Sequence, residues 1–177
     1  MPRPGDKGPT GGDVRLARSQ GADGPVEITS RSVDELSSPR LKETFAVWRE
    51  KCGGPDQLPA ADGFDILDYR AAIGNLNLIA VERDPLDFIL RVHSATGATY
   101  VGRDLTGRSI DDYPDPDYRD FVRTVFTRAV QSKQPVILIE ELLTADNRRM
   151  SWEGIVLPLQ DAAGEASRLI VAFEILN

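Results

Sequence analysis

The stretch Gly102–Tyr113, GRDLTGRSIDDY, decides the fold of this chain. It places two glycines, two arginines and three aspartates within twelve residues. A short apolar segment ends just before it, at Tyr100 and Val101, and a strongly periodic segment begins just after it. Glycine permits turns that other residues resist, and acidic residues stabilise the positive end of a following helix. We therefore interpret this stretch, called the connector below, as the link between short turns beside a sheet and a long helix.

The segment after the connector is the clearest helix in the sequence. We expect it over Asp117–Ser132, with Asp115 as its cap and Pro116 at its first position. Its apolar residues recur with helical spacing: Tyr118, Phe121, Val122, Val125, Phe126 and Ala129. The other face carries three arginines, Arg119, Arg123 and Arg128. This pattern predicts an amphipathic helix that packs on a sheet and turns a solvated basic face outward.

Apolar and branched runs bounded by turns predict five strands: Leu76–Glu82, Asp87–His93, Gln134–Leu143, Arg148–Leu159 and Ser167–Leu176. A turn at Arg83–Pro85 makes the first two a hairpin, and short connections, including a turn at Asp146–Asn147, make the last three a meander. Short helices are expected over Ile66–Ile73 and Ser94–Val101. The order predicts an α+β domain, in which helices cross one face of a five-stranded antiparallel sheet and leave a space between.

The N-terminal part is expected to have two pieces. Residues 1–31 are rich in glycine and proline and poor in apolar side chains, so we expect a disordered leader. Residues 32–55 form a flanking segment with a helix over Pro39–Lys51, capped by Ser38. Its apolar positions share one helical face: Leu41, Phe45, Trp48 and Cys52. This face either packs on the remaining domain, residues 56–177, or forms the seam of a homodimer.

Charge and composition limit the partners and the location. The chain carries 21 basic and 28 acidic side chains, a net charge of −7, which argues against binding to nucleic-acid phosphates or anionic membranes. No apolar run approaches the length of a membrane span, and the N-terminus lacks a secretory pattern, so we expect a cytoplasmic protein. One cysteine, Cys52, and one histidine, His93, exclude an intramolecular disulfide and a Cys/His zinc cluster.

Three regions, which together cover roughly Leu41–Leu176, carry a family resemblance. The first is the tryptophan-bearing helix followed by LPAADGFDILDYRAAIGNLNLIAVE, and the second is DFILRV followed by the connector. The third joins the long helix to QPVILIEELL, RRMSWEGIVLPLQD and the final strand. On these residues the chain resembles a PAS domain, in particular a bacterial family of short, nearly single-domain PAS-like proteins. The GRDLTGR run is the specific part of the match.

The resemblance implies a sensory or protein-interaction module. PAS domains bind small molecules between sheet and helices, dimerise, or relay a conformational change to a partner. No output domain is recognised in the sequence, so we expect a signal to pass through association, with a second copy or with a signalling partner. The resemblance gives no ligand. It also departs at Arg91–Ala95, where the family has small or glycine-containing residues, so it assigns no role to His93.

Five aromatic side chains lie near the expected space between helices and sheet: Phe88, Tyr100, Phe121, Phe126 and Trp152. We expect them to pack the core, and they would line a pocket if that space forms a cavity. Arg91 lies late in its strand, Arg103 and Arg108 flank the LTG turn of the connector, and His93 completes the candidate pocket residues. We favour the interpretation that the arginines pair with aspartates of the connector and pin it to the sheet. The alternative is a site at the pocket mouth for an anionic small molecule, because a guanidinium fork recognises carboxylate or phosphate.

Cofactors have little support in the sequence. A flavin photoreceptor of the PAS class would need an Asn-Cys-Arg motif in its short helix, and Ser94–Arg103 has none. Haem would need His93 as an axial ligand, and we favour a hydrogen-bonded structural histidine instead. The aspartates of DDYPDPD lack the spacing of a calcium loop, so we expect them to stabilise the helix start rather than to bind metal.

Catalysis has little support either. A Ser/His/Asp or Cys/His site would have to use His93, and Cys52 is explained as a small buried apolar residue. We therefore expect no enzyme activity. Two alternatives stay open: a small enzyme that uses the pocket for acid–base chemistry, and a purely structural dimerisation domain.

Overall fold

The computed structural model describes residues 15–16, 28–143 and 149–176. The α-helices of this part are α1 (Pro39–Lys51), α2 (Ala95–Val101) and α3 (Pro116–Ser132). Short 3-10 helices are η1 (Val33–Glu35), η2 (Ala61–Gly63), η3 (Ile66–Ala72) and η4 (Ile110–Asp112). The strands are β1 (Arg15–Leu16), β2 (Leu76–Glu82), β3 (Asp87–Val92), β4 (Val136–Leu143), β5 (Arg149–Gln160) and β6 (Ala166–Leu176).

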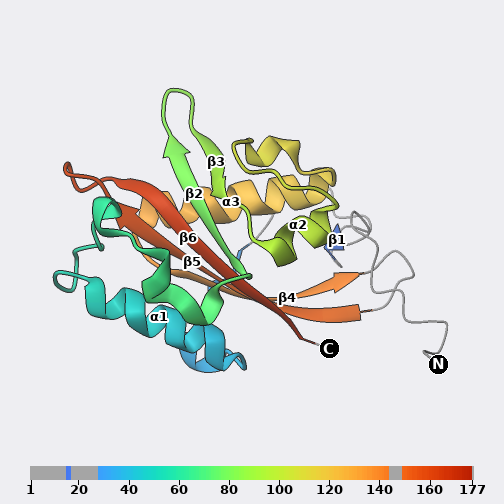
Figure 1. Ribbon diagram of the computed structural model, residues 1–177, viewed down its shortest axis with the longest axis horizontal. Coiled ribbons are helices and arrows are strands. Elements are labelled where there is room, and N and C mark those ends of the chain that lie inside the picture. The colour runs from blue at the N-terminus through green and yellow to red at the C-terminus, as the bar shows by residue number, and fades with distance from the viewer. Residues whose placement is uncertain (1–14, 17–27, 144–148, 177) are drawn as a thin grey trace.

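These strands form one antiparallel sheet in the order β1-β4-β5-β6-β2-β3 (Figure 1). The hairpin β2–β3 and the meander β4–β5–β6 confirm the predicted topology, and the α+β fold is confirmed with them. The hairpin and the meander form one sheet because β2 pairs with β6. The turn expected at Asp146–Asn147 lies outside the described residues.

A sixth strand, which we did not predict, comes from the leader. The two residues of β1 pair with the outer edge of β4, Arg15 opposite Leu143 and Leu16 opposite Leu142. Further along, the Arg31 N–H donates to the Ile137 carbonyl at 2.8 Å. The expectation of disorder is therefore wrong for these leader residues, because they satisfy backbone groups on the open edge of β4. The other leader residues before Ile28 lie outside the described part of the chain.

Helices cover both faces of the sheet, as adjacent residues of β5 show. Neighbours on a strand point to opposite faces. The Trp152 ring packs edge-on against Phe121 of α3, with ring centroids 6.5 Å apart. The Glu153 carboxylate instead accepts the backbone N–H groups of Ser37 and Ser38, at 2.7 and 2.9 Å, where α1 begins. Consequently α2, η4 and α3 occupy one face and α1 the other (Figure 1).

The apolar face of α1 packs on the sheet of its own chain. Leu41 is fully buried and Trp48 is 2% exposed, and the indole Nε1–H donates to the Pro158 carbonyl at 3.0 Å. Phe45 is half-buried beside Trp48. The candidate dimer seam through these three side chains is therefore wrong for this structure, because Leu41 and Trp48 already belong to the core of one molecule. Cys52, expected to be buried, is half-buried at the end of the same helix.

The connector docks on the free edge of β3. The Leu90 N–H donates to the Arg108 carbonyl at 2.9 Å, and the Gly107 N–H donates to the Leu90 carbonyl at 2.7 Å. Gly107 has φ +83°, a left-handed conformation that glycine adopts without strain. The connector thus supplies hydrogen-bond partners that a further strand would have given this edge.

Arg123 of α3 clamps the connector to β3. Its Nη2 lies 3.2 Å from Asp87 Oδ1 and 2.6 Å from Asp111 Oδ1, and its guanidinium stands over the Phe88 ring, 5.9 Å from the centroid. Ser109 Oγ donates to the same Asp87 oxygen at 2.8 Å. The expected solvated basic face is wrong at this position, because Arg123 is only 34% exposed and bridges strand, connector and helix.

His93 joins the connector to the end of β3. Its Nδ1 accepts the Leu105 N–H at 2.9 Å, and its side chain is 1% exposed. Burial lowers the pKa of His93 below its ordinary 6.5, and the Asp104 carboxylate, 3.7 Å from Nδ1, opposes this only in part. The imidazole is therefore neutral at pH 7, and its Nδ1 carries no proton.

We expect Arg123→Met to lower the free energy of unfolding by about 1–2 kcal/mol, because it leaves two carboxylates without their shared cation while it keeps the apolar stem. Arg91→Met is the matched control. Among the described residues, Arg91 pairs with Glu82, at 3.6 Å, and both side chains are more than half exposed, so the loss of Arg91 should cost under about 0.5 kcal/mol. Urea unfolding of both variants measures the difference. Equal effects would contradict the clamp.

We also expect the free energy of unfolding to depend on His93. Since its pKa is lower in the folded state, stability is fully present above about pH 6.5 and falls as the pH drops below that value, with a slope of at most one proton. His93 is the only histidine, so this window reports on one side chain. Urea unfolding between about pH 5.5 and about pH 7.5 measures the slope, with His93→Asn as a flat control. A wild-type protein of constant stability would disprove a neutral buried imidazole.

Candidate functional site

A cavity of about 90 Å³ lies between the sheet and the helices α2 and α3. It is the space that the sequence predicted between helix and sheet. Its walls are mainly apolar and aromatic, and they come from four strands, both helices and the end of the connector. The lining residues are Asn77, His93, Gly97, Tyr100, Val101, Tyr113, Pro114, Asp115, Tyr118, Phe121, Val122, Val125, Phe126, Leu138, Trp152, Val156, Val171, Phe173 and Ile175.

Alternate residues of the central strands form the floor of the cavity. They share one face because side chains in a strand alternate: Trp152 and Val156 on β5, and Val171, Phe173 and Ile175 on β6. Gly154 lies between the first two. A Cβ added to Gly154 would fall 2.3 Å from Cη2 of Trp152, so this glycine lets the indole lie against the strand. A residue with a side chain here would push the ring into the cavity.

The apolar stripe of α3 forms the roof, as its spacing predicted. The roof residues are Tyr118, Phe121, Val122, Val125 and Phe126, and Gly97, Tyr100 and Val101 of α2 close one side. Tyr113 stands edge-on to Tyr118, with ring centroids 5.0 Å apart. Burial raises the pKa of Tyr113 well above its ordinary value of 10, so this phenol keeps its proton.

Charged groups are scarce in the cavity wall. Asp115 is a lining residue, and its Oδ1 accepts the N–H groups of Asp117 and Tyr118, at 2.9 and 3.4 Å, as the cap of α3. Its carboxylate is thus committed to the start of the helix, where negative charge is favourable. The rest of the wall is neutral, since His93 carries no charge at pH 7.

Two buried polar side chains face this apolar space, His93 and Asn77. The Oδ1 of Asn77 accepts the Ser94 N–H at 2.8 Å, which fixes the start of α2 against β2. His93 uses Nδ1 to hold the connector, and its buried Nε2 has no hydrogen-bond partner among the described residues. The cavity wall therefore contains one buried polar atom that protein groups leave unsatisfied.

Most of the predicted aromatic pocket residues do line the cavity. Tyr100, Phe121, Phe126 and Trp152 are in its wall, together with His93. Phe88 is not, because it lies fully buried behind Phe126, with ring centroids 5.4 Å apart.

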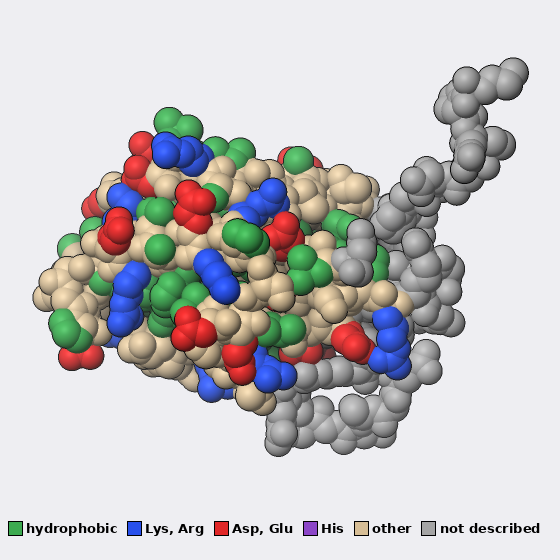
Figure 2. Space-filling view, turned by 90° about the horizontal axis from the view of Figure 1, so that it is seen from below, with side chains coloured by type: hydrophobic (Ala, Val, Ile, Leu, Met, Phe, Trp, Pro, Cys, Tyr) green, Lys and Arg blue, Asp and Glu red, His purple; other side chains and the backbone are tan. Residues whose placement is uncertain are grey.

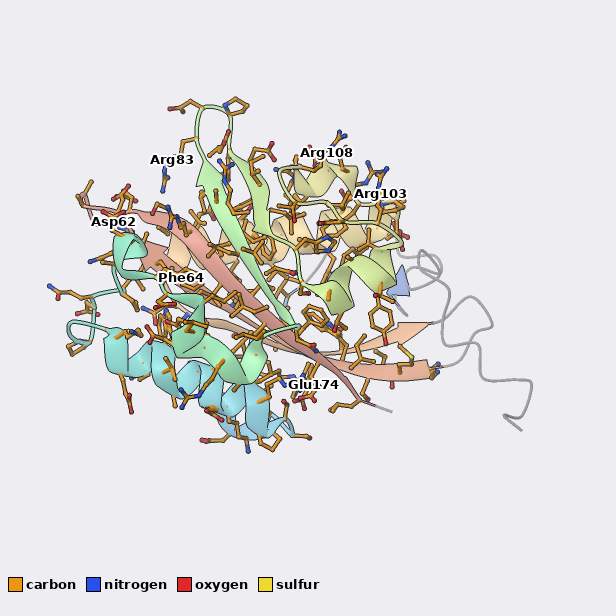
Figure 3. The ribbon with its side chains drawn as sticks, in the orientation of Figure 1. Asp62, Phe64, Arg83, Arg103, Arg108 and Glu174 are labelled. Carbon is orange, nitrogen blue, oxygen red and sulfur yellow. The ribbon has the colours of Figure 1, made fainter. Side chains whose placement is uncertain are left out.

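The three candidate arginines are outside the cavity. Arg91 pairs with Glu82 on the outer surface. Arg103 donates to the Asp112 carbonyl at 3.0 Å, and Arg108 lies 3.8 Å from the Asp112 carboxylate. Figure 3 shows Arg103 and Arg108 at the outer rim of the connector, directed away from the sheet. The expectation that these arginines belong to the pocket is therefore wrong. Their charged ends stay in water, and Arg103 and Arg108 hold the connector to itself.

Sequence reasoning missed Asn77, Gly97 and Tyr113 as lining residues. Asn77 carried a usable signal, since a lone amide inside the apolar run LNLIAVE needs a buried hydrogen-bond partner. Gly97 gave no such signal, because its closeness to His93 depends on how α2 packs. Within the described ranges, no group of three or more acidic, histidine or cysteine side chains could hold a metal ion, and no helix there is long and apolar enough to cross a membrane.

Several solved structures are similar to this chain. A light-oxygen-voltage domain studied with a flavin analogue has a TM-score of 0.48 and 12% identity, over 67% of this chain and 89% of that one. VqmA of Vibrio cholerae, in complex with a ligand and DNA, has a TM-score of 0.45 and 11% identity, over 56% and 45%. The match thus spans about half of the VqmA chain. The light-oxygen-voltage domain of Aureochrome1 has a TM-score of 0.43 and 17% identity, over 64% and 84%.

A comparison with proteins that have curated descriptions gives no match to this sequence. The family model described as PAS domain, in contrast, matches residues 36–173. The matched range begins before α1, contains the connector and α3, and ends within β6. It covers well over half of the chain, and the family is one of sensory and ligand-binding modules. The resemblance seen in the sequence is confirmed, and the chain belongs to the PAS domain family.

Proposed function

We propose that this protein is a sensory PAS module that binds a small molecule in the cavity between α3 and the sheet. The observation that carries the proposal is the cavity itself, an apolar and aromatic space of about 90 Å³ whose wall includes a residue with a buried polar atom that has no partner in the described part of the chain. Pockets for small molecules are mostly apolar with a few polar groups that fix orientation. A purely structural domain would instead fill this space with side chains.

The elements around the cavity offer a route from ligand to surface. His93 touches the cavity and holds the connector through Leu105, and Tyr113 and Asp115 touch the cavity where the connector passes into α3. A ligand that presses on these groups would bias the position of the connector and of the helix start. This route supports a sensor whose output is association with another protein.

Association through α1 would have to use its outer face. Leu41 and Trp48 are committed to the core, whereas Lys42, Glu43, Arg49 and Glu50 are exposed. Figure 2, which views the molecule from the side of α1, shows basic and acidic side chains interspersed on this face. A homodimer or a signalling partner that binds here would be held by charge pairs, so its affinity should fall with salt.

A small enzyme is the weaker alternative. The carboxylate nearest to His93, that of Asp104, is 67% exposed and does not line the cavity. The one lining carboxylate, Asp115, is used as a helix cap. Acid–base catalysis needs a positioned group of matched pKa beside the substrate, and this arrangement favours binding. The resemblance to short bacterial PAS-like proteins and the acidic composition support a role in signal regulation in the bacterial cytoplasm, without nucleic acid or membrane as partner.

We expect native mass spectrometry of the protein as isolated to show a retained small molecule in the wild type. Val156→Phe should abolish the retained mass, because Val156 is in the cavity floor and the larger ring would fill the space. Val47→Phe is the matched control: Val47 is half-buried on α1, on the other face of the sheet. Absence of a ligand from the wild type, or its retention by Val156→Phe, would count against the proposal.

A further inference from the structure

The position of the proton on His93 follows from its hydrogen bond. Nδ1 accepts the Leu105 N–H with its lone pair, so this nitrogen carries no proton. A neutral imidazole carries its single proton on the other nitrogen. His93 is buried and neutral, so its Nε2 bears the proton and acts as a donor.

This donor is buried, lies on the cavity wall and has no acceptor in the described part of the chain. Buried donors in native proteins are almost always paired, and an unpaired one lowers stability. The missing acceptor is therefore expected to come from whatever occupies the cavity.

Gly97 packs directly beside this donor. A Cβ added to Gly97 would lie 3.0 Å from His93 Nε2 and 2.9 Å from Ser94 Oγ. Ser94 Oγ accepts the Gly97 N–H at 3.0 Å, so the first turn of α2 fixes this hydroxyl relative to Gly97. Even an alanine at this position would crowd the donor.

The charge and size of the cavity restrict the ligand. The arginines at 91, 103 and 108 are on the outer surface, and the lining carboxylate of Asp115 would repel an anion. A dry cavity of about 150 Å³ holds benzene, so about 90 Å³ suits a compact group of a few heavy atoms. Aromatic rings of Phe121, Phe126 and Trp152 form much of the wall.

We infer that the cavity binds a small, uncharged, mainly apolar molecule with one hydrogen-bond acceptor, such as a ketone oxygen or a ring nitrogen, which receives the His93 Nε2–H. This inference rests on the proposed function and adds to it the ligand class and the residue that orients the ligand. It replaces the anionic ligand that the sequence left open.

Acetone and isobutene, which are small enough for the cavity, test the inference as a pair. They have nearly the same shape, and only the ketone can accept a hydrogen bond. We expect the ketone to bind about threefold to tenfold more tightly, the range of one hydrogen bond. Titrations followed by NMR of uniformly ¹⁵N-labelled protein give both affinities. The single imidazole of the chain gives one pair of ring-nitrogen signals, and the ketone should shift Nε2 while its proton stays in place.

Variants separate a specific donor from a general apolar effect. His93→Asn keeps an acceptor near the Nδ1 position for Leu105 and removes the Nε2 donor, so the preference for the ketone should vanish. Gly97→Ala leaves the His93 side chain unchanged and adds a methyl group beside its Nε2. It should therefore weaken the binding of the ketone more than that of the hydrocarbon. Arg103→Ala, on the outer rim, should leave both affinities unchanged.

Equal affinities of the wild type for the two probes would overturn the inference and leave the proposed ligand-binding function standing. Binding of neither probe would overturn the proposed function and the inference with it. A preference that survives in both His93→Asn and Gly97→Ala would show that another donor orients the ketone.

Discussion

The docking of the connector on the free edge of β3 is the constraint on which the rest of the structure depends. Two backbone hydrogen bonds between Leu90 and the Gly107–Arg108 turn replace the strand that this edge lacks. Asp87 and Asp111 meet at Arg123, which ties the connector to α3 as well. With the connector fixed on the sheet, α3 begins directly after its cap, Asp115, and runs across the floor formed by β5 and β6. The cavity is the space that this geometry leaves between them.

His93 links the docked connector to the cavity. One imidazole of the cavity wall has two different nitrogens: Nδ1 holds the Leu105 backbone, and the buried Nε2 has no partner in the described part of the chain. The hydrogen bond on one side decides which nitrogen carries the proton on the other. The state of the connector and the chemistry of the cavity are thereby set by the same side chain. Burial in an apolar wall makes this arrangement sensitive to a single hydrogen bond from a ligand.

Periodicity in the sequence was enough to predict the layers of the fold. The stripe from Tyr118 to Ala129 and the alternating strands specify which faces are apolar, and a sheet with such faces must be covered. The contacts that long polar side chains make could not be predicted. Arg123 lies on the polar side of α3 by spacing, yet it pairs with Asp87, 36 positions earlier in the chain. Arg103 and Arg108 looked like pocket residues because of their place in the connector. Their direction depends on the docked backbone, which no local pattern shows. Asn77 and Gly97 reach the site only through the packing of α2.

The most direct test of this account is the behaviour of the Leu105 amide when the cavity is filled. If His93 joins cavity and connector, adding acetone to ¹⁵N-labelled protein should shift the Leu105 amide resonance and slow its hydrogen exchange, because the ligand holds the imidazole that accepts this N–H. The Lys42 amide, which donates to the Ser38 carbonyl at the start of α1 on the other face of the sheet, should change little. Resonance shifts confined to residues of the cavity floor, with the Leu105 amide unchanged when the protein is saturated with the probe, would contradict the claim that one histidine links ligand and connector.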